Sequence, residues 1–187
     1  GGGLRMAPAD DKIIKVSRPL ALEPYDKMIV SIMAKKVATG VDYLVLDIPV
    51  GPTCKVPNMK HANEIESKFK SLCKKFGMKI IVVKTPAKQP VGRGIGPALE
   101  ARDILRIMQL HKFRPLDLEN KSCKLTGALL ELMKYCPKGK GYAIAKAQIK
   151  NGQAWKKLNQ IIVAQGGEDN LNSEEVMQEV LRHEFQT

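Results

Sequence analysis

The sequence has no long hydrophobic run, no cluster of histidines and few aromatic residues. Phe, Trp and Tyr make up 5% of the 187 residues, and the three histidines lie far apart at positions 61, 111 and 183. No apolar stretch reaches the roughly 18–20 residues that a membrane-spanning helix needs, and the first residues do not have the layout of a signal peptide. We therefore expect no membrane partner, no histidine-based metal site and a cytoplasmic protein.

Cysteine pairs and the common cofactor-binding motifs are also missing. The four cysteines, at positions 54, 73, 123 and 136, form no C-x-x-C pair, so reduced thiols are expected rather than a disulfide framework. The sequence contains neither a G-x-x-x-x-G-K-[ST] phosphate loop nor an H-E-x-x-H zinc motif. These absences predict a protein without a bound metal or cofactor.

Acidic residues are scarce relative to basic ones over most of the chain. There are 31 Lys and Arg residues against 19 Asp and Glu residues, which gives a formal net charge of +12. Residues 168–187 hold six of the acids and one of the bases, so the excess of positive charge lies before them. Such an excess predicts attraction to an anionic partner, which could be nucleic acid, a membrane surface or a phosphorylated ligand.

Short apolar runs alternate with helical patterns in the first half of the chain. The pattern predicts strands at 12–18, 42–50 and 79–84, and helices at about 24–39, 60–76 and 97–111. Beyond these it predicts only helices, at about 121–135, 141–150, 153–165 and 173–184. This order indicates an α/β fold. We expect a three-layer body with a mixed or parallel sheet, flanking helices and a helical C-terminal section.

Two loops are predicted at the carboxyl ends of the strands, where open α/β sheets bind their ligands. In the loop at 51–57, Lys55 could reach a ligand phosphate, or it could be one of many surface lysines. In the loop at 86–96, a G-x-G-x-G sequence precedes a helix. Its backbone N–H groups could hold an anion, or the glycines could serve only a tight connection.

Three more polar residues are candidates for a functional site, two in the first long predicted helix and one at its start. Ser31 and Lys35 are four residues apart and therefore share a helical face. A hydroxyl and an ammonium together could hold a heterocyclic base or a phosphate, although they could also form a solvated stripe beside the core. Glu23 precedes Pro24 at the start of the helix, where it could cap the helix or act as a general acid.

Nucleic-acid binding by a non-enzymatic basic domain is the alternative function. The lysines are dispersed, few aromatic residues lie between them, and no signature of a DNA- or RNA-binding module occurs. We therefore do not expect a nucleic-acid partner.

Four segments, taken in order, resemble one known family. They are APADD (7–11), PYDKMIVSIMAKKVATGVDYLVLDIPVGP (24–52), QPVGRGIGPALEARD (89–103) and AQGGEDNL (164–171). They resemble the nucleoside phosphorylase family, which contains thymidine and pyrimidine-nucleoside phosphorylases and AMP phosphorylases. The form DIPVGPTCKV at 47–56 is more similar to the AMP phosphorylase branch and its bacterial relatives than to the short thymidine enzymes.

The resemblance implies reversible phosphorolysis, a pentosyl transfer without a cofactor. Inorganic phosphate displaces the base from C1′ of a nucleoside or nucleoside 5′-monophosphate and leaves a sugar 1-phosphate. By resemblance, Ser31 and Lys35 contact the base and Lys55 binds the nucleotide. Glu23 falls where the AMP phosphorylase branch has an aspartate proton donor, which makes it the candidate catalytic acid.

The resemblance also bears on metal binding and on the extent of the chain. Some pyrimidine enzymes of the family bind potassium through two backbone carbonyls and a carboxylate, which would fall at Val91, Gly94 and Asp103. Family members run to several hundred residues, and their phosphate-binding motifs lie upstream of APAD. We expect residues 1–187 to be a single piece of the α/β catalytic domain, truncated at both ends and inactive alone. We expect the full-length protein to be a homo-oligomer.

Overall fold

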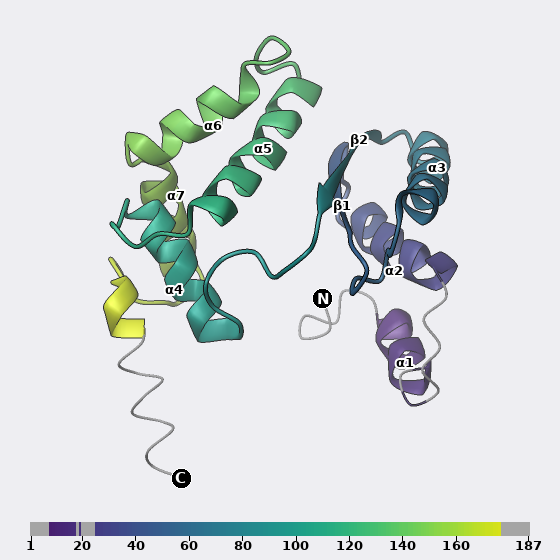
Figure 1. Cartoon of the computed structure of the whole chain (residues 1–187), viewed down its shortest axis with the longest axis horizontal. Coiled ribbons are helices and arrows are strands. Elements are labelled where there is room, and N and C mark those ends of the chain that lie inside the picture. Colours follow the sequence, from purple (N-terminus) through teal and green to yellow (C-terminus); the bar gives the residue numbers. More distant parts are fainter. Residues whose placement is uncertain (1–7, 18, 20–24, 177–187) are drawn as a thin grey trace. The chain divides into compact units, whose positions relative to one another are not determined.

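A computed structural model describes residues 8–17, 19 and 25–176 (Figure 1). The chain divides into two compact units, residues 1–88 and residues 89–187. Each unit has its own cluster of buried hydrophobic side chains. That residues 1–187 form one piece of a catalytic domain stays a prediction.

The first unit contains a strand–helix–strand motif preceded by two helices. Its elements are α1 (Pro8–Ser17), α2 (Tyr25–Ala38), β1 (Tyr43–Val50), α3 (Met59–Lys75) and β2 (Lys79–Pro86). The two strands are parallel, with Leu44 opposite Ile80 and Val50 opposite Pro86. The predicted strands at 42–50 and 79–84 and the predicted helix at 60–76 are therefore confirmed, with small differences at their ends.

The predicted strand at 12–18 is wrong, because residues 12–17 belong to helix α1. Ile14 and Val16 are two residues apart, which suits a strand, whereas Ile13 and Val16 are three residues apart, which suits one side of a helix. Pro8 occupies the first helical position, where its missing N–H costs nothing. Lys15 lies in the last turn and suits the negative end of the helix dipole.

The core of the first unit lies between β1 and the two helices α2 and α3. Leu44 and Ile48 are on one face of β1 and are buried, as expected from the period of two along a strand. The helices contribute Ile29 and Met33 from α2 and Ile65 and Phe69 from α3, all of which are buried in the same cluster. Figure 1 shows both helices beside the strands.

The second unit is helical over its described residues. Its helices are α4 (Pro97–Met108), α5 (Leu116–Leu132), α6 (Gly141–Lys150) and α7 (Gln153–Ala164). All four predicted helices in this range are confirmed, although α5 begins five residues earlier than expected. Pro115 stands at its N-cap, and the acids Asp117 and Glu119 lie in its first turn, where negative charge stabilises the helix. The helix predicted at 173–184 is described only at residues 173–176, which are helical.

Helices α5 and α6 form a hairpin with a very close crossing (Figure 1). A Cβ atom added to Gly127 would lie 2.5 Å from the backbone nitrogen of Tyr142, and one added to Gly141 would lie 2.1 Å from the carbonyl oxygen of Gly127. The hairpin is further joined by a buried carboxylate. Glu119 of α5 lies 2.7 Å from Arg114 Nε and 3.5 Å from Lys146 Nζ of α6.

The structure confirms an α/β fold with parallel strands and a helical C-terminal section. Within the described residues the sheet has two strands, and the three-layer arrangement stays a prediction. Over the same residues, no helix is both long enough and apolar enough to cross a membrane.

Candidate functional site

The first candidate site lies at the carboxyl ends of β1 and β2. Gly51 follows β1 directly, and a Cβ atom there would lie 2.0 Å from the carbonyl oxygen of Ala87, which follows β2. Ala87 N–H donates to the carbonyl of Val50 at 2.9 Å. The loops that leave the two strands therefore lie directly against each other, and only glycine fits at position 51.

The loop from Gly51 to Val56 is a tight turn that carries Lys55. Gly51 N–H donates to the carbonyl of Val56 at 3.1 Å, and Cys54 N–H donates to the carbonyl of Gly51 at 3.0 Å. Val56 is buried, whereas Lys55 is exposed. Lys55 is thus an exposed residue on an anchored backbone, and its contact with a ligand phosphate stays a prediction.

The N-terminal ends of α2 and α3 also lie at this loop. The Tyr25 hydroxyl, at the start of α2, donates to the backbone carbonyl of Lys55 at 2.8 Å. The Tyr25 ring lies 5.7 Å from the ring of His61, in the first turn of α3. Asn58 caps α3, with its side-chain oxygen accepting the N–H of His61 at 3.1 Å. Two helix starts, each with a partial positive charge, therefore flank the loop that carries Lys55.

The predicted pairing of Ser31 and Lys35 is present. Lys35 Nζ donates to Ser31 Oγ at 2.8 Å, and both residues are partly buried. They lie on a side of α2 different from that of Ile29 and Met33, which face the core. Ser31 follows Tyr25 by six residues, which is about 9 Å along a helix axis. The pair and Lys55 are thus supported by the same helix.

Glu23, the candidate catalytic acid, lies outside the described residues. It precedes Tyr25 by two residues in the sequence.

The glycine loop of the second unit uses its N–H groups internally. Asp103, which is 2% exposed, accepts the N–H of Arg93 at 2.6 Å and that of Gly94 at 3.0 Å through Oδ2. Asp117 accepts the N–H of Gly92 at 3.1 Å. Since these donors already have carboxylate acceptors, the structure favours the tight connection over the anion site.

Electrostatics support this role of Asp117. The N–H of Gly92 stabilises the charged form of Asp117 and lowers the pKa of that carboxyl below its usual range. The loop is therefore held most strongly when Asp117 is ionised.

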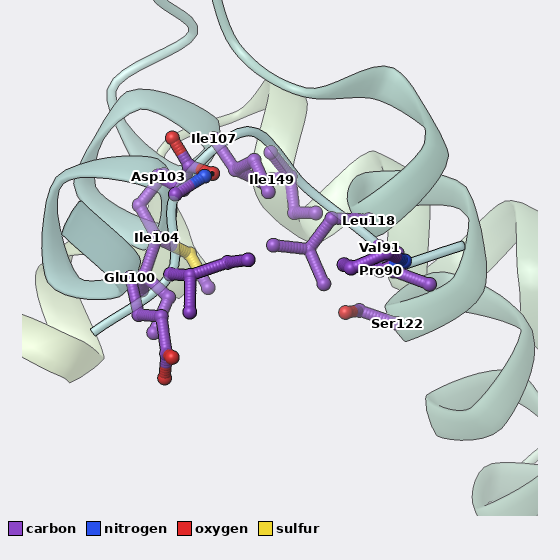
Figure 2. A pocket seen from close by; sticks show the side chains of 12 residues that line it. Pro90, Val91, Glu100, Asp103, Ile104, Ile107, Leu118, Ser122 and Ile149 are labelled. Atoms are coloured by element: carbon purple, nitrogen blue, oxygen red, sulfur yellow. Dashed lines mark hydrogen bonds between the residues drawn. The ribbon is translucent and has the colours of Figure 1, made fainter. Parts of the chain in front are cut away.

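A pocket of about 530 Å³ opens beside the glycine loop. Figure 2 shows apolar side chains reaching into it, among them Ile104, Leu118 and Ile149. The three residues of the implied potassium site line this pocket; they are Val91, Gly94 and Asp103. The Asp103 carboxylate already accepts two N–H groups, and its Oδ1 lies 3.3 Å from the Arg102 guanidinium. The Asp103 carboxylate therefore already has hydrogen-bond donors from the chain itself. The described residues also contain no cluster of three or more His, Cys, Asp or Glu that could hold a metal.

Sequence reasoning missed the roles of Tyr25 and Asp103. Asp103 follows Gly94 by nine residues and lies in the helix after the glycine loop. This position could have indicated the contact, because a buried carboxylate needs hydrogen-bond donors. The contact between Tyr25 and Lys55 joins residues that are 30 positions apart in the sequence, so no local sequence pattern predicts it.

No protein-family model matches the chain. Individual relatives do match it. An AMP phosphorylase from Methanococcus aeolicus is 44% identical over 167 residues, which cover 89% of this chain and 33% of that protein. An AMP phosphorylase from Methanosarcina acetivorans is 39% identical over 176 residues, covering 94% of this chain and 35% of that protein. A protein named "Putative thymidine phosphorylase" from Rhodopseudomonas palustris is 46% identical over 169 residues, covering 89% of this chain and 32% of that protein.

The chain spans about a third of the length of the curated relatives it matches. The aligned stretches of 167 to 176 residues are longer than either unit and therefore extend into both. The chain is therefore a homologue of the AMP phosphorylases and of their relatives named for thymidine phosphorylase activity.

Proposed function

We propose that the whole protein catalyses the phosphorolysis of a nucleoside or a nucleoside 5′-monophosphate. In this reaction the C1′–N bond to the base breaks and a C1′–O bond to inorganic phosphate forms, which yields the free base and a sugar 1-phosphate. The homology to phosphorylases supports the reaction class. The observation that carries the proposal is the Lys35–Ser31 contact of 2.8 Å on the helix that begins at the Lys55 loop.

Ser31 and Lys35 are proposed to bind the base. The hydroxyl of Ser31 can both donate and accept, and the ammonium of Lys35 can donate three hydrogen bonds. Because the pair is partly buried, a base that replaces water there would meet groups already oriented by a hydrogen bond between them. As the C1′–N bond breaks, negative charge develops on the base, and the Lys35 ammonium would stabilise it.

Lys55 is proposed to bind the 5′-phosphate of a nucleotide substrate. Its exposed side chain extends from an anchored loop between two helix starts. A phosphate at this position would be attracted both by the ammonium and by the partial positive charges of the helix ends. A nucleoside has no such phosphate and would not use Lys55.

Glu23 is proposed as the acid that protonates the leaving base. A carboxyl group can act as an acid near neutral pH only if burial or a neighbouring negative charge raises its pKa. Inorganic phosphate and a phosphorylated substrate would supply such negative charge. This assignment rests on the resemblance, together with the position of Glu23 two residues before Tyr25.

The remaining features of the whole protein are also proposals. They are a three-layer sheet to which β1 and β2 contribute, a homo-oligomeric state and a place in cytoplasmic nucleotide salvage. The 187-residue chain alone is proposed to be inactive, because the motifs that bind inorganic phosphate in the family are not among its residues.

Kinetics of the full-length protein test the proposal. Base release from nucleosides and nucleoside monophosphates is measured with and without inorganic phosphate. Ser31→Ala and Lys35→Ala should each raise the KM for the substrate by about fivefold to tenfold, the usual effect of losing one hydrogen bond to a ligand. Wild-type KM values in both variants would remove the pair from the site. The absence of phosphate-dependent base release from the unaltered protein would remove the proposed reaction.

Nucleic-acid binding remains the second candidate, and one surface favours it. The turn between α5 and α6 carries Lys134, Lys138 and Lys140, and its Tyr135 is 72% exposed. Lysines around an exposed aromatic ring are typical of surfaces that bind single strands. Binding to unrelated oligonucleotides that weakens steeply with salt, with no response to nucleosides, would support this function instead.

A further inference from the structure

The geometry points to Tyr25 as a positioning residue for Lys55, and through it as a determinant of preference for substrates that carry a 5′-phosphate. The inference rests on the proposed function, in which Lys55 binds that phosphate. The homology and the sequence motifs assign no role to Tyr25.

The contact acts on the backbone of Lys55. The Tyr25 hydroxyl donates to the Lys55 carbonyl at 2.8 Å. A fixed carbonyl fixes the peptide plane, and with it the direction in which the Lys55 side chain leaves the loop. The residues on either side are also held, because Cys54 N–H donates to Gly51 and Val56 accepts from Gly51. Tyr25 therefore completes the anchoring of the loop at the exposed residue Lys55.

The Tyr25 ring is held independently of its hydroxyl. It packs against the core cluster of the first unit, and its centroid lies 5.7 Å from that of His61. His61 is itself held, since its ring Nδ1 lies 3.0 Å from the side-chain oxygen of Asn58, the residue that caps α3. A phenylalanine at position 25 would keep these ring contacts and lose only the hydrogen bond to Lys55.

Pre-orientation of Lys55 has a consequence that depends on the substrate. A long lysine side chain loses rotamer freedom when it binds a ligand, and a fixed backbone lowers that cost. Only a substrate with a 5′-phosphate uses Lys55, so only its affinity depends on the Tyr25 hydroxyl. A general structural role of Tyr25 would affect nucleosides and nucleotides equally.

The test is steady-state kinetics of Tyr25→Phe in the full-length protein, with a nucleoside and its 5′-monophosphate as the two substrates. Tyr142→Phe, which removes a tyrosine hydrogen bond of the same length to the Asn120 side chain in the other unit, is the matched control. We expect the KM for the monophosphate to rise about fivefold in Tyr25→Phe, as loss of one ordinary hydrogen bond predicts. The kcat values and the nucleoside KM should stay within twofold of those of the unaltered protein.

A double substitution separates positioning from direct contact. In a Lys55→Ala background, Tyr25→Phe should have no further effect on the monophosphate KM, because the residue being positioned is gone. Equal losses for both substrates, unchanged kinetics in Tyr25→Phe, or a full additive effect in the Lys55→Ala background would each overturn the inference. If the unaltered protein cleaves neither substrate, the proposed function fails and the inference fails with it. If the unaltered protein is active and Tyr25→Phe behaves like it, only the inference fails.

Discussion

Replacing Asp103 by alanine should destabilise the second unit strongly. The Asp103 carboxylate is 2% exposed and is the acceptor for two backbone N–H groups, those of Arg93 and Gly94. Alanine would leave both donors without their acceptor. The glycine loop and the start of α4 depend on these bonds, since the loop turns back onto the helix through them.

The magnitude follows from the number of bonds. Leaving one buried donor unsatisfied costs about 1–3 kcal/mol. The two hydrogen bonds to Asp103 are part-buried, so water relieves some of this cost, and we expect a loss of about 2–4 kcal/mol in the free energy of unfolding. Asp103→Asn keeps the shape and one oxygen but removes the charge, so it should cost less, about 1–2 kcal/mol.

Urea denaturation of the 187-residue chain measures the effect. Trp155 is the only tryptophan and lies in α7 of the second unit, so its fluorescence reports on that unit. Asp169→Ala is the matched control, because Asp169 is an exposed aspartate of the same unit whose carboxylate accepts a hydrogen bond from the Asn159 side chain. Such an exposed contact contributes about 0–1 kcal/mol. A loss in Asp103→Ala no larger than that in Asp169→Ala would refute the reasoning.

Two further predictions concern the packing and the acid sensitivity of the second unit. Gly127→Ala should lower the free energy of unfolding by about 1–3 kcal/mol, as measured by urea denaturation, because the new methyl group would lie 2.5 Å from the Tyr142 nitrogen. A stability equal to that of the unaltered chain would show that α5 and α6 can separate freely. The bond from Gly92 lowers the pKa of Asp117 below its ordinary value of 3.8, so its stabilising effect is complete above about pH 4 and is lost as the pH falls through the lowered pKa. Urea midpoints at pH 6, 4 and 3 should therefore fall less steeply in Asp117→Asn than in the unaltered chain, and parallel curves would contradict this assignment.

The helices of the second unit and the two parallel strands could be predicted because their signals are local. Apolar spacing along the chain indicated α6 and α7, and continuous apolar runs indicated β1 and β2. Residues 12–17 were wrongly assigned to a strand, because a segment of six residues with three apolar members fits both the strand period of two and the helix period of 3.6. Here the proline at the helix start was the better guide.

The candidate site was predictable in part, for a related reason. The Lys35–Ser31 pair follows from a spacing of four along one helix. The use of the glycine loop was not predictable from the glycines alone, because the decisive fact is that Asp103, in the next helix, takes their N–H groups. The contact between Tyr25 and Lys55 depends on the packing of α2 beside the β1–α3 connection, which a one-dimensional pattern does not contain.

The close approach of Gly51 to Ala87 has a consequence for the order of folding. The two residues are 36 positions apart in the sequence. Gly51, in the loop that carries Lys55, packs against the Ala87 carbonyl, which reaches this position only after β2 has paired with β1. The loop cannot reach its final form from local interactions, so its closing belongs to the late, non-local part of the folding reaction. Native-state hydrogen exchange should therefore show the amides of Gly51 and Cys54 opening together with those of β2, as one cooperative unit.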